Sequence, residues 1–314
     1  MSAEVLTAGE TMVLFDPVAD GEIVHGLGFT LRLAGAESNF AVGLSRLGVG
    51  VTWVSRLGTD PFGDVIENAL AAEGLDLRFV ERDPLRPTGV FFKWRSGGRS
   101  HVLYYRRGSA ASALAPEHVP DEALEGVRLV HLTGITTALG ESARALVLEL
   151  AARARSCGAT VLFDPNWRPA LWRTPKEAAD AQRAVLPNVD WYLCGAEEGR
   201  LLFGVEDAAE LLAAIRASGA GNAVVRVGAR GCVVEGAGGV VEVPPLREAE
   251  VLDEIGAGDA FAAGFAYGLL QGWTASDCAR AGNVIAAAAL SGTGDWETLP
   301  RLREVERELQ PRGA

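Results

Sequence analysis

The sequence predicts an α/β protein: a three-layer αβα sandwich with a mostly parallel central sheet, plus a small β-sheet lid. Apolar strand segments alternate with helical segments along most of the chain. The strands are apolar throughout rather than at every second position, which is typical of parallel strands covered on both faces. Two β-rich segments, at about 11–33 and 86–108, interrupt this alternation and predict the lid. The 314 residues, 48% of them hydrophobic, are expected to form a single domain, 1–314.

The first half of the chain is expected to supply both lid segments. Glycines close the predicted helices at Gly48 and Gly74, and Gly97-Gly98 marks a hairpin turn. The chain is predicted to begin with a buried strand (Val5–Gly9), short lid strands (Met12–Leu33) and a helix (Ala34–Gly48). A strand (Val51–Ser55), a second helix (about 64–73) and the lid hairpin (Thr88–Tyr105) are predicted to follow.

The second half continues the strand–helix rhythm to the end of the chain. Its predicted strands and helices alternate at Leu129–Leu132, Glu141–Cys157, Thr160–Asp164, Pro175–Leu186, Trp191–Leu193, Ala208–Ala217 and Ala223–Val227. A hairpin is then expected between Gly231–Glu235 and Val240–Val243, followed by two alanine-rich helices that start at Ala260 and Ala275.

Composition and charge exclude several classes of partner. The net charge of −12 and the pI near 4.9 argue against binding to nucleic acid or to an anionic membrane, because both require clustered cations. The four cysteines are scattered, without a C-x-x-C pair, so neither a disulfide framework nor a structural zinc site is indicated. Without a signal-like or membrane-spanning segment in the sequence, we expect a cytoplasmic protein.

The segment Gly256-Ala257-Gly258-Asp259 is the strongest candidate for a chemical site. Small residues in a turn that leads into a helix let several backbone N–H groups converge, and the helix start adds its positive dipole end. These features predict an anion hole. A carboxylate beside an anion hole repels the ligand unless it has a task, such as taking a proton from an attacking hydroxyl. The alternative is that Asp259 caps the helix, and the motif alone favours neither interpretation.

Four further polar clusters follow predicted strands, where ligands bind in open α/β sheets. Each also has a structural interpretation. Asn39 can be a helix cap, Tyr104 and Arg106 an ordinary cross-strand pair, and Asp164 before Pro165 a turn starter. Glu197 and Glu198 can be acids of a helix's first turn, which the helix dipole favours. Arg168 has the better functional case, because its guanidinium suits bidentate recognition of a carboxylate or phosphate. The clusters are Gly35–Asn39, Tyr104–Arg107, Asp164–Arg168 and Gly195–Glu198.

Two common nucleotide motifs are missing from the sequence. There is no G-x-x-x-x-G-K-[ST], and no G-x-G-x-x-G follows a strand near the N-terminus. An anion hole with a base, at one end of a parallel sheet and beneath a lid that excludes water, contains the parts used in phosphoryl transfer to an alcohol.

These residues resemble the ribokinase-like (PfkB-type) carbohydrate kinases along essentially the whole chain. The signatures are AGAESNFAVGLSRLG (34–48) followed by GTDPFG (58–63), and D-x-x-GAGDAFAAGF (253–265). Within that family, YYRRGSAAS, HLTGI, FDPNWRPALW and LCGAEEGRLLFG resemble the 2-keto-3-deoxygluconate kinases. The resemblance implies an ATP- and Mg²⁺-dependent kinase of a small sugar or sugar acid that forms a homo-oligomer. The expected reaction converts 2-keto-3-deoxygluconate to its 6-phosphate.

The resemblance also implies roles for particular residues. Asp259 would be the base, and the amides of Gly256, Ala257 and Gly258 would stabilise charge on the transferring phosphoryl group. Residues that would line the sugar site are Gly35, Asn39, Tyr104, Arg106 and Arg168, the two arginines being candidates for an acid sugar's carboxylate. Those that would border ATP are Val227, Gly228, Gly231, Gly258 and Asn283. Glu198 would contact Mg²⁺ through water, and Asp253 would lie near a monovalent cation such as K⁺.

The chain departs from the family pattern at four positions. Glu254 stands where the family usually has Thr, and Gly195 replaces the Asn of the N-x-x-E magnesium motif. Arg226 stands where many relatives have Lys, and Phe91 where some 2-keto-3-deoxygluconate kinases have a substrate-contacting Tyr. These departures affect the metal and substrate assignments more than the reaction class. A fructokinase or ribokinase acting on a neutral sugar is the alternative, and a non-catalytic sugar or nucleotide sensor is the alternative from a different class.

Overall fold

The fold is that of a computed structural model, which describes residues 3–236, 239–245, 256–292 and 294–310. The predicted α/β architecture is confirmed: a nine-stranded sheet has the order β13-β12-β11-β10-β9-β8-β1-β4-β5. The strands from β11 to β5 are parallel, and β12 and β13 extend the sheet as antiparallel strands. The strands are β1 (Val5–Ala8), β4 (Val51–Gly58), β5 (Val80–Asp83), β8 (Leu129–Thr133), β9 (Thr160–Asp164), β10 (Trp191–Gly195), β11 (Asn222–Arg226), β12 (Cys232–Gly236) and β13 (Gly239–Val243).

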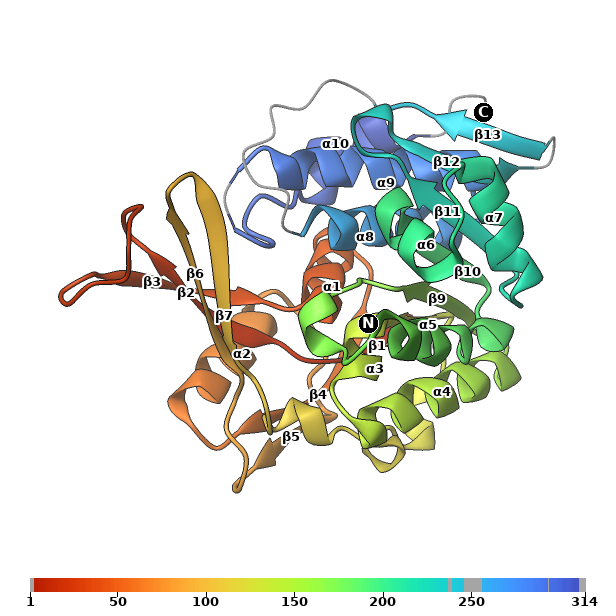
Figure 1. The fold of residues 1–314 in the computed structure, drawn as a ribbon. Coiled ribbons are helices and arrows are strands. Elements are labelled where there is room, and N and C mark those ends of the chain that lie inside the picture. Colours follow the sequence, from red (N-terminus) through yellow and green to blue (C-terminus); the bar gives the residue numbers. More distant parts are fainter. Residues whose placement is uncertain (1–2, 237–238, 246–255, 293, 311–314) are drawn as a thin grey trace.

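Helices cover both faces of this sheet, which gives the three layers (Figure 1). Neighbouring sheet residues face opposite ways: Leu193 belongs to the core beneath one helical layer, and Tyr192 and Cys194 belong to the core beneath the other. The first layer contains α1 (Ala36–Arg46), α2 (Pro61–Ala72), α8 (Ala257–Leu270), α9 (Ala275–Leu290) and α10 (Leu302–Leu309). The remaining helices are α3 (Gly134–Ala138), α4 (Glu141–Ser156), α5 (Pro175–Arg183), α6 (Ala196–Phe203) and α7 (Ala208–Ala217).

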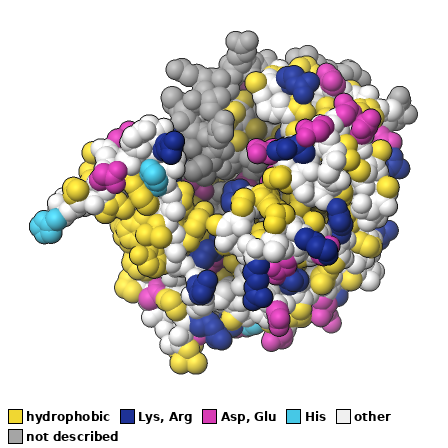
Figure 2. All heavy atoms as spheres, in the orientation of Figure 1, with side chains coloured by type: hydrophobic (Ala, Val, Ile, Leu, Met, Phe, Trp, Pro, Cys, Tyr) yellow, Lys and Arg dark blue, Asp and Glu magenta, His cyan; other side chains and the backbone are white. Residues whose placement is uncertain are grey.

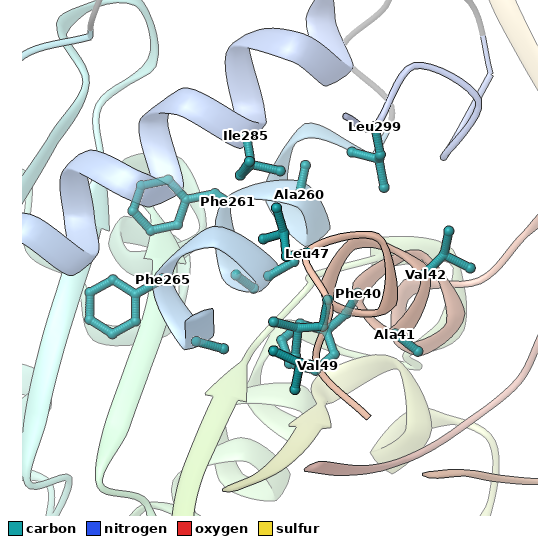
Figure 3. Packing of buried hydrophobic residues seen from close by; sticks show 14 of the residues in the cluster. Phe40, Ala41, Val42, Leu47, Val49, Ala260, Phe261, Phe265, Ile285 and Leu299 are labelled. Atoms are coloured by element: carbon teal, nitrogen blue, oxygen red, sulfur yellow. The ribbon is translucent and has the colours of Figure 1, made fainter. Parts of the chain in front are cut away.

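Close packing of α1, α8 and α9 fixes the part of the first layer that carries the site. Figure 3 shows Phe40 of α1 and Leu47, which directly follows α1, near Ala260 of α8, with Ile285 of α9 also packed against α8. A Cβ on Gly264 would lie 2.5 Å from the carbonyl oxygen of Ala281, so only glycine permits this approach of α8 to α9. The start of α8 is therefore held by a dense apolar core rather than by surface contacts.

A second sheet of four strands, here called the lid sheet, projects from the edge of the body (Figure 1). Its order is β3-β2-β6-β7, with β2 and β6 parallel and the other pairs antiparallel. The Gly97-Gly98 turn joins β6 to β7 as predicted, both glycines having positive φ. The strands are β2 (Met12–Pro17), β3 (Phe29–Ala34), β6 (Val90–Ser96) and β7 (Arg99–Tyr105).

Several predicted boundaries are wrong. The first alanine-rich helix begins at Ala257 rather than Ala260, because Gly256 takes a left-handed conformation (φ 76°) that starts the helix earlier. The helix predicted over Pro175–Leu186 ends at Arg183, and a 3₁₀ turn occupies Leu186–Asn188. The short elements β5, α3 and α10 were not predicted. No described helix has the length and apolar character needed to cross a membrane.

Candidate active site

A cavity of about 490 Å³ lies between the lid sheet and the carboxyl ends of the parallel strands. The lid sheet supplies one wall. The others come from the end of β9 and the loop after it, the end of β11, and the first turns of α1, α3, α6 and α8. Side chains in its wall that carry polar or charged groups are Asn39, Lys93, Tyr104, Arg106, Asp164, Asn166, Arg168, Glu198, Arg226, Asp259 and Asp295. The predicted residues Gly35, Gly256 and Gly258 also line the cavity.

Asp259 occupies the first turn of α8 and is buried. The N-cap of α8 is Gly256, and none of the described side chains caps this helix end. The interpretation of Asp259 as a helix cap is therefore wrong, because the helix already includes Ala257 and Gly258 before it. Its carboxylate points instead to two side-chain amides of the cavity wall.

Two asparagines hold the Asp259 carboxylate, one at each oxygen. Nδ2 of Asn39 donates to Oδ2 over 2.8 Å, and Nδ2 of Asn166 donates to Oδ1 over 2.9 Å. The cap interpretation of Asn39 is also wrong, since Gly35 is the N-cap of α1 and Asn39 lies within the helix. Asn166 follows β9 in a turn with φ 38°, where its backbone N–H donates to Asp164 Oδ1 over 2.8 Å. Asp164 is thus the turn starter that its position before Pro165 predicts.

Burial controls the acidity of Asp259. Loss of hydration disfavours the ionised carboxylate and raises its pKa from 3.8 to about 8, and the charges of Asp164 and Asp295 act in the same direction. The Asn39 amide and the Arg168 charge oppose this rise in pKa. A carboxylate with a pKa near neutrality is well matched to accept a proton in general base catalysis.

The start of α8 also presents backbone donors to the same cavity. The first N–H groups of a helix have no intrahelical acceptor, and Gly256 and Gly258 line the cavity beside Asp259. Since no described side chain caps this helix end, these N–H groups suit an anion, which the helix dipole also favours. This part of the cavity therefore fits the phosphates of a nucleotide.

Arg226 forms a part-buried ion cluster next to the anion hole. Its Nη1 donates to Asp164 Oδ2 over 2.7 Å and to the carbonyl of Gly258 over 3.2 Å, and its Nη2 lies 3.4 Å from Glu198 Oε2. Burial raises the pKa of Glu198, as does the neighbouring charge of Asp164. The cluster joins the ends of β9 and β11 to the starts of α6 and α8.

Glu198, the predicted magnesium residue, already accepts two backbone N–H groups. Its Oε1 accepts from Trp167 over 2.8 Å and its Oε2 from Gly195 over 2.7 Å. Within the described part of the chain, no group of three or more His, Cys, Asp or Glu residues could hold a metal ion. One carboxylate with its oxygens already engaged fits a water-mediated contact to a phosphate-bound Mg²⁺ better than direct ligation. Asp253, the predicted residue near a monovalent cation, lies outside the described residues, as does Glu254.

The two arginines predicted at the sugar site have different surroundings. Arg106 is buried and forms an ion pair with Glu10, whereas the Arg168 guanidinium donates over 3.3 Å to the carbonyl of Trp167. Among the described residues, Arg168 has no carboxylate partner within salt-bridge distance. Tyr104 stacks on Phe91 in the cavity wall, with ring centroids 5.4 Å apart. Arg168 is therefore the arginine that remains available for an anionic group of a ligand.

Of the residues predicted to border ATP, Gly258 lines this cavity and the other four do not. Val227 and Gly228 directly follow Arg226, and Gly231 precedes β12. The Asn283 amide donates to the carbonyls of Val243 over 3.1 Å and Pro244 over 3.2 Å, so it ties α9 to the end of β13. The described contacts give Asn283 a structural role.

Two acidic residues of the site were missed by the sequence analysis. Asp295, in the loop after α9, lies with Oδ2 3.2 Å from the Asn39 amide nitrogen and lines the cavity. Glu10, between β1 and β2, binds Arg106. The position of Glu10 directly after a buried strand was a signal that could have identified it. No sequence pattern marks Asp295.

Comparison with known proteins identifies the family of the chain. The model of the pfkB family carbohydrate kinases matches residues 2–302. The chain is 35% identical to the 2-dehydro-3-deoxygluconokinase of Thermoproteus tenax, over 98% of this chain and 94% of that protein. It is 32% identical to the 2-dehydro-3-deoxygalactonokinase of Haloferax volcanii, over 99% and 98% of the two chains. Fructokinase from Vibrio cholerae, in a form with bound fructose, ADP and calcium, superposes with a TM-score of 0.84 at 26% identity, over 98% and 99% of the chains.

The chain belongs to the pfkB family of carbohydrate kinases. It is an ATP-dependent phosphotransferase that acts on a sugar hydroxyl and uses ATP with a divalent metal ion. Curated relatives at 32–35% identity are named 2-dehydro-3-deoxygluconokinases, the enzymes also called 2-keto-3-deoxygluconate kinases.

Proposed function

We propose that this kinase transfers the γ-phosphoryl group of ATP to the 6-hydroxyl of 2-keto-3-deoxygluconate, forming the 6-phosphate. The observation that carries the proposal is Arg168, a guanidinium that shares the cavity with Asp259 and has no carboxylate partner among the described residues. A neutral sugar gives such an arginine nothing to neutralise, whereas the carboxylate of a sugar acid matches its paired N–H donors. Relatives named for keto-deoxy sugar acids support the same substrate class.

In the proposed reaction, Asp259 acts as the general base. The sugar hydroxyl gives its proton to the Asp259 carboxylate while its oxygen forms a bond to the γ-phosphorus, and the bond from that phosphorus to ADP breaks. Backbone N–H groups at Gly256, Ala257 and Gly258 stabilise the negative charge on the transferring group. The Asn39 and Asn166 amides orient the base, because each donates to one of its oxygens.

The remaining assignments place the substrates around this centre. Gly35, Asn39, Tyr104, Arg106 and Arg168 contact the sugar acid, and all five line the cavity. We assign Val227, Gly228 and Gly231 to the border of the ATP site because they continue from Arg226, with Asn283 supporting that border. A divalent ion, when bound, neutralises phosphate charge; Glu198 would contact Mg²⁺ through water, and Asp253 would lie near a monovalent cation such as K⁺.

A substrate panel tests the proposal. ADP release is measured with 2-keto-3-deoxygluconate, its galactonate epimer, fructose and ribose, at saturating ATP and Mg²⁺. We expect kcat/KM for the acid sugars to exceed that for the neutral sugars. Equal or better turnover of fructose or ribose would instead identify a neutral-sugar kinase. No turnover with any sugar would favour a non-catalytic sensor.

We also propose that two copies of the chain associate through the lid sheet. Leu31, Phe15, Phe92 and Leu103 are register partners across the four strands, so they form one apolar row on the face opposite Phe91 and Tyr104. Leu31 and Leu103 are exposed, and Figure 2 shows hydrophobic side chains gathered over the lid sheet. An exposed apolar row of this kind supports an interface with a second copy. Light scattering should give a dimer that Leu103→Glu converts to a monomer; a monomeric wild-type chain contradicts the proposal.

A further inference from the structure

We propose that Glu10 is a positioning residue for the sugar site: it fixes Arg106 at the point where the lid sheet joins the body. This inference rests on the proposed function, because it assumes that Arg106 contacts the sugar. Glu10 is 2% exposed and Arg106 is 9% exposed, so the pair lies in the protein interior.

The contacts of Glu10 use both carboxylate oxygens. Oε2 accepts from Nε of Arg106 over 2.7 Å and lies 2.5 Å from its Nη2. Oε1 accepts from the hydroxyl of Ser109 over 2.5 Å. Nε and Nη2 form one edge of the planar guanidinium, and both bind the same Glu10 oxygen. The orientation of the Arg106 side chain is therefore fixed before any ligand binds.

Glu10 also stands where the chain crosses between body and lid sheet. The chain enters the lid sheet through residues 9–11 and again at Gly89, and it returns at Gly35 and at Arg106–Ser109. A Cβ on Gly89 would lie 2.7 Å from Oε1 of Glu10, and a Cβ on Gly35 would lie 2.4 Å from the carbonyl oxygen of Glu10. All four segments that connect the body to the lid sheet therefore lie close to Glu10. Two of them can do so because they have glycine, Gly35 and Gly89, at the point of approach.

The position of Arg106 follows from these contacts. Arg106 leaves β7 and faces the cavity together with Tyr104, with its guanidinium 5.8 Å from the centre of the Tyr104 ring. The Glu10 carboxylate balances the charge of Arg106, so Arg106 supplies directed donors rather than a net positive charge. Arg168 then supplies the net positive charge at the sugar site. This division of roles predicts that removing Glu10 affects sugar binding specifically.

The experiment compares Glu10→Gln with the wild type, using whichever sugar the wild type phosphorylates. Loss of the charged partner should raise the KM for the sugar by about tenfold, the scale expected when hydrogen bonds to a charged group are lost. The KM for ATP and kcat should stay within about twofold, because the phosphate-binding start of α8 does not contact Glu10. Arg106→Ala and the double variant Glu10→Gln/Arg106→Ala complete a cycle. In the Arg106→Ala background, Glu10→Gln should leave the sugar KM unchanged.

Glu73→Gln is the matched control, because it removes a part-buried carboxylate that binds Arg46 Nε over 2.9 Å and Nη2 over 2.6 Å, and neither residue lines the cavity. This variant should lose stability without a change in the sugar KM. Glu10→Asp provides a second test if Glu10→Gln does not fold, because the shorter side chain keeps the charge but cannot reach both Arg106 and Ser109.

The proposal is overturned if folded Glu10→Gln or Glu10→Asp keeps the wild-type sugar KM, or if the effect of Glu10→Gln persists undiminished in the Arg106→Ala background. These outcomes are separate from a failure of the proposed function, which the substrate panel on the wild-type chain reveals by itself. If the protein proves to be a kinase of neutral sugars, the same double-mutant cycle can be measured with the KM of that sugar.

Discussion

The side-chain amide of Asn39 donates to Asp259 across 220 residues of sequence, over 2.8 Å. This contact joins the first turns of two helices, α1 and α8, at the floor of one cavity. Because Asn166 binds the other carboxylate oxygen, the base is oriented from two sides. The orientation and acidity of Asp259 therefore depend on residues from three separate segments of the chain.

The acidity of Asp259 predicts a pH dependence of activity. Its pKa is raised to about 8, mainly by burial, and the base works only when ionised. We expect kcat/KM to fall as the pH decreases below about 8, whereas an ordinary aspartate would cause this fall only at about pH 4. A pH profile of kcat/KM from pH 5 to 10 measures this acidic limb of the profile, in which activity is lost as Asp259 is protonated. A flat profile between pH 6 and 9 would show that Asp259 does not limit the rate through its protonation.

Asn39→Ala should move that limb further toward alkaline pH. The Asn39 amide favours the ionised carboxylate, so its removal raises the pKa of Asp259. At pH 7 we expect kcat/KM to fall by about tenfold, with partial recovery at pH 9. Asn222→Ala is the control, since that amide binds the carbonyl of Asp190 in the body, away from the cavity. A limb that moves toward acidic pH in Asn39→Ala would contradict this role.

Asp259→Asn should make the folded protein more stable at alkaline pH. The folded pKa of about 8 exceeds the ordinary value of 3.8, so the contribution of this group to stability is complete below about pH 3.8 and is lost as the pH rises through about 8. An asparagine cannot ionise and avoids that loss. The difference in free energy of unfolding between variant and wild type should grow from pH 5 to pH 9 in urea titrations. A difference that is constant across this range would exclude a buried, raised pKa.

Arg168→Ala tests the assignment of the sugar-acid carboxylate. Loss of its paired donors should lower kcat/KM for 2-keto-3-deoxygluconate by about 10- to 100-fold, the scale of a charge-assisted hydrogen-bonded pair. Activity with a neutral sugar should change little. Arg144→Ala serves as the control, because that arginine binds the carbonyl of Thr137 outside the cavity. Equal losses for acid and neutral sugars would assign Arg168 to the phosphates or to the fold instead.

The alternation of strands and helices predicted the three layers, because buried parallel strands require long apolar runs and crossover helices. The Gly97-Gly98 turn and the β-rich flanking segments likewise predicted the four-stranded lid sheet. Short elements such as β5 and α3 carry too few residues for a periodic pattern and were missed.

The candidate site was predictable where a local motif marks it and not where it depends on distant contacts. The Gly256–Asp259 turn predicted the anion hole and the carboxylate. Only the structure excludes the alternative that Asp259 caps its helix, because it shows that Gly256 is the N-cap. Asp295 and Glu10 were missed because their partners, Asn39 and Arg106, lie 256 and 96 residues away. Nothing in the neighbouring sequence indicates such pairings.

The turnover of Asp259→Asn tests the central claim most directly, with kcat measured at saturating ATP, Mg²⁺ and sugar on protein shown to be folded and to bind ATP. If Asp259 is the general base, kcat should fall by about 10²- to 10⁴-fold while ATP affinity is retained. Unchanged turnover in the folded variant would contradict the assignment.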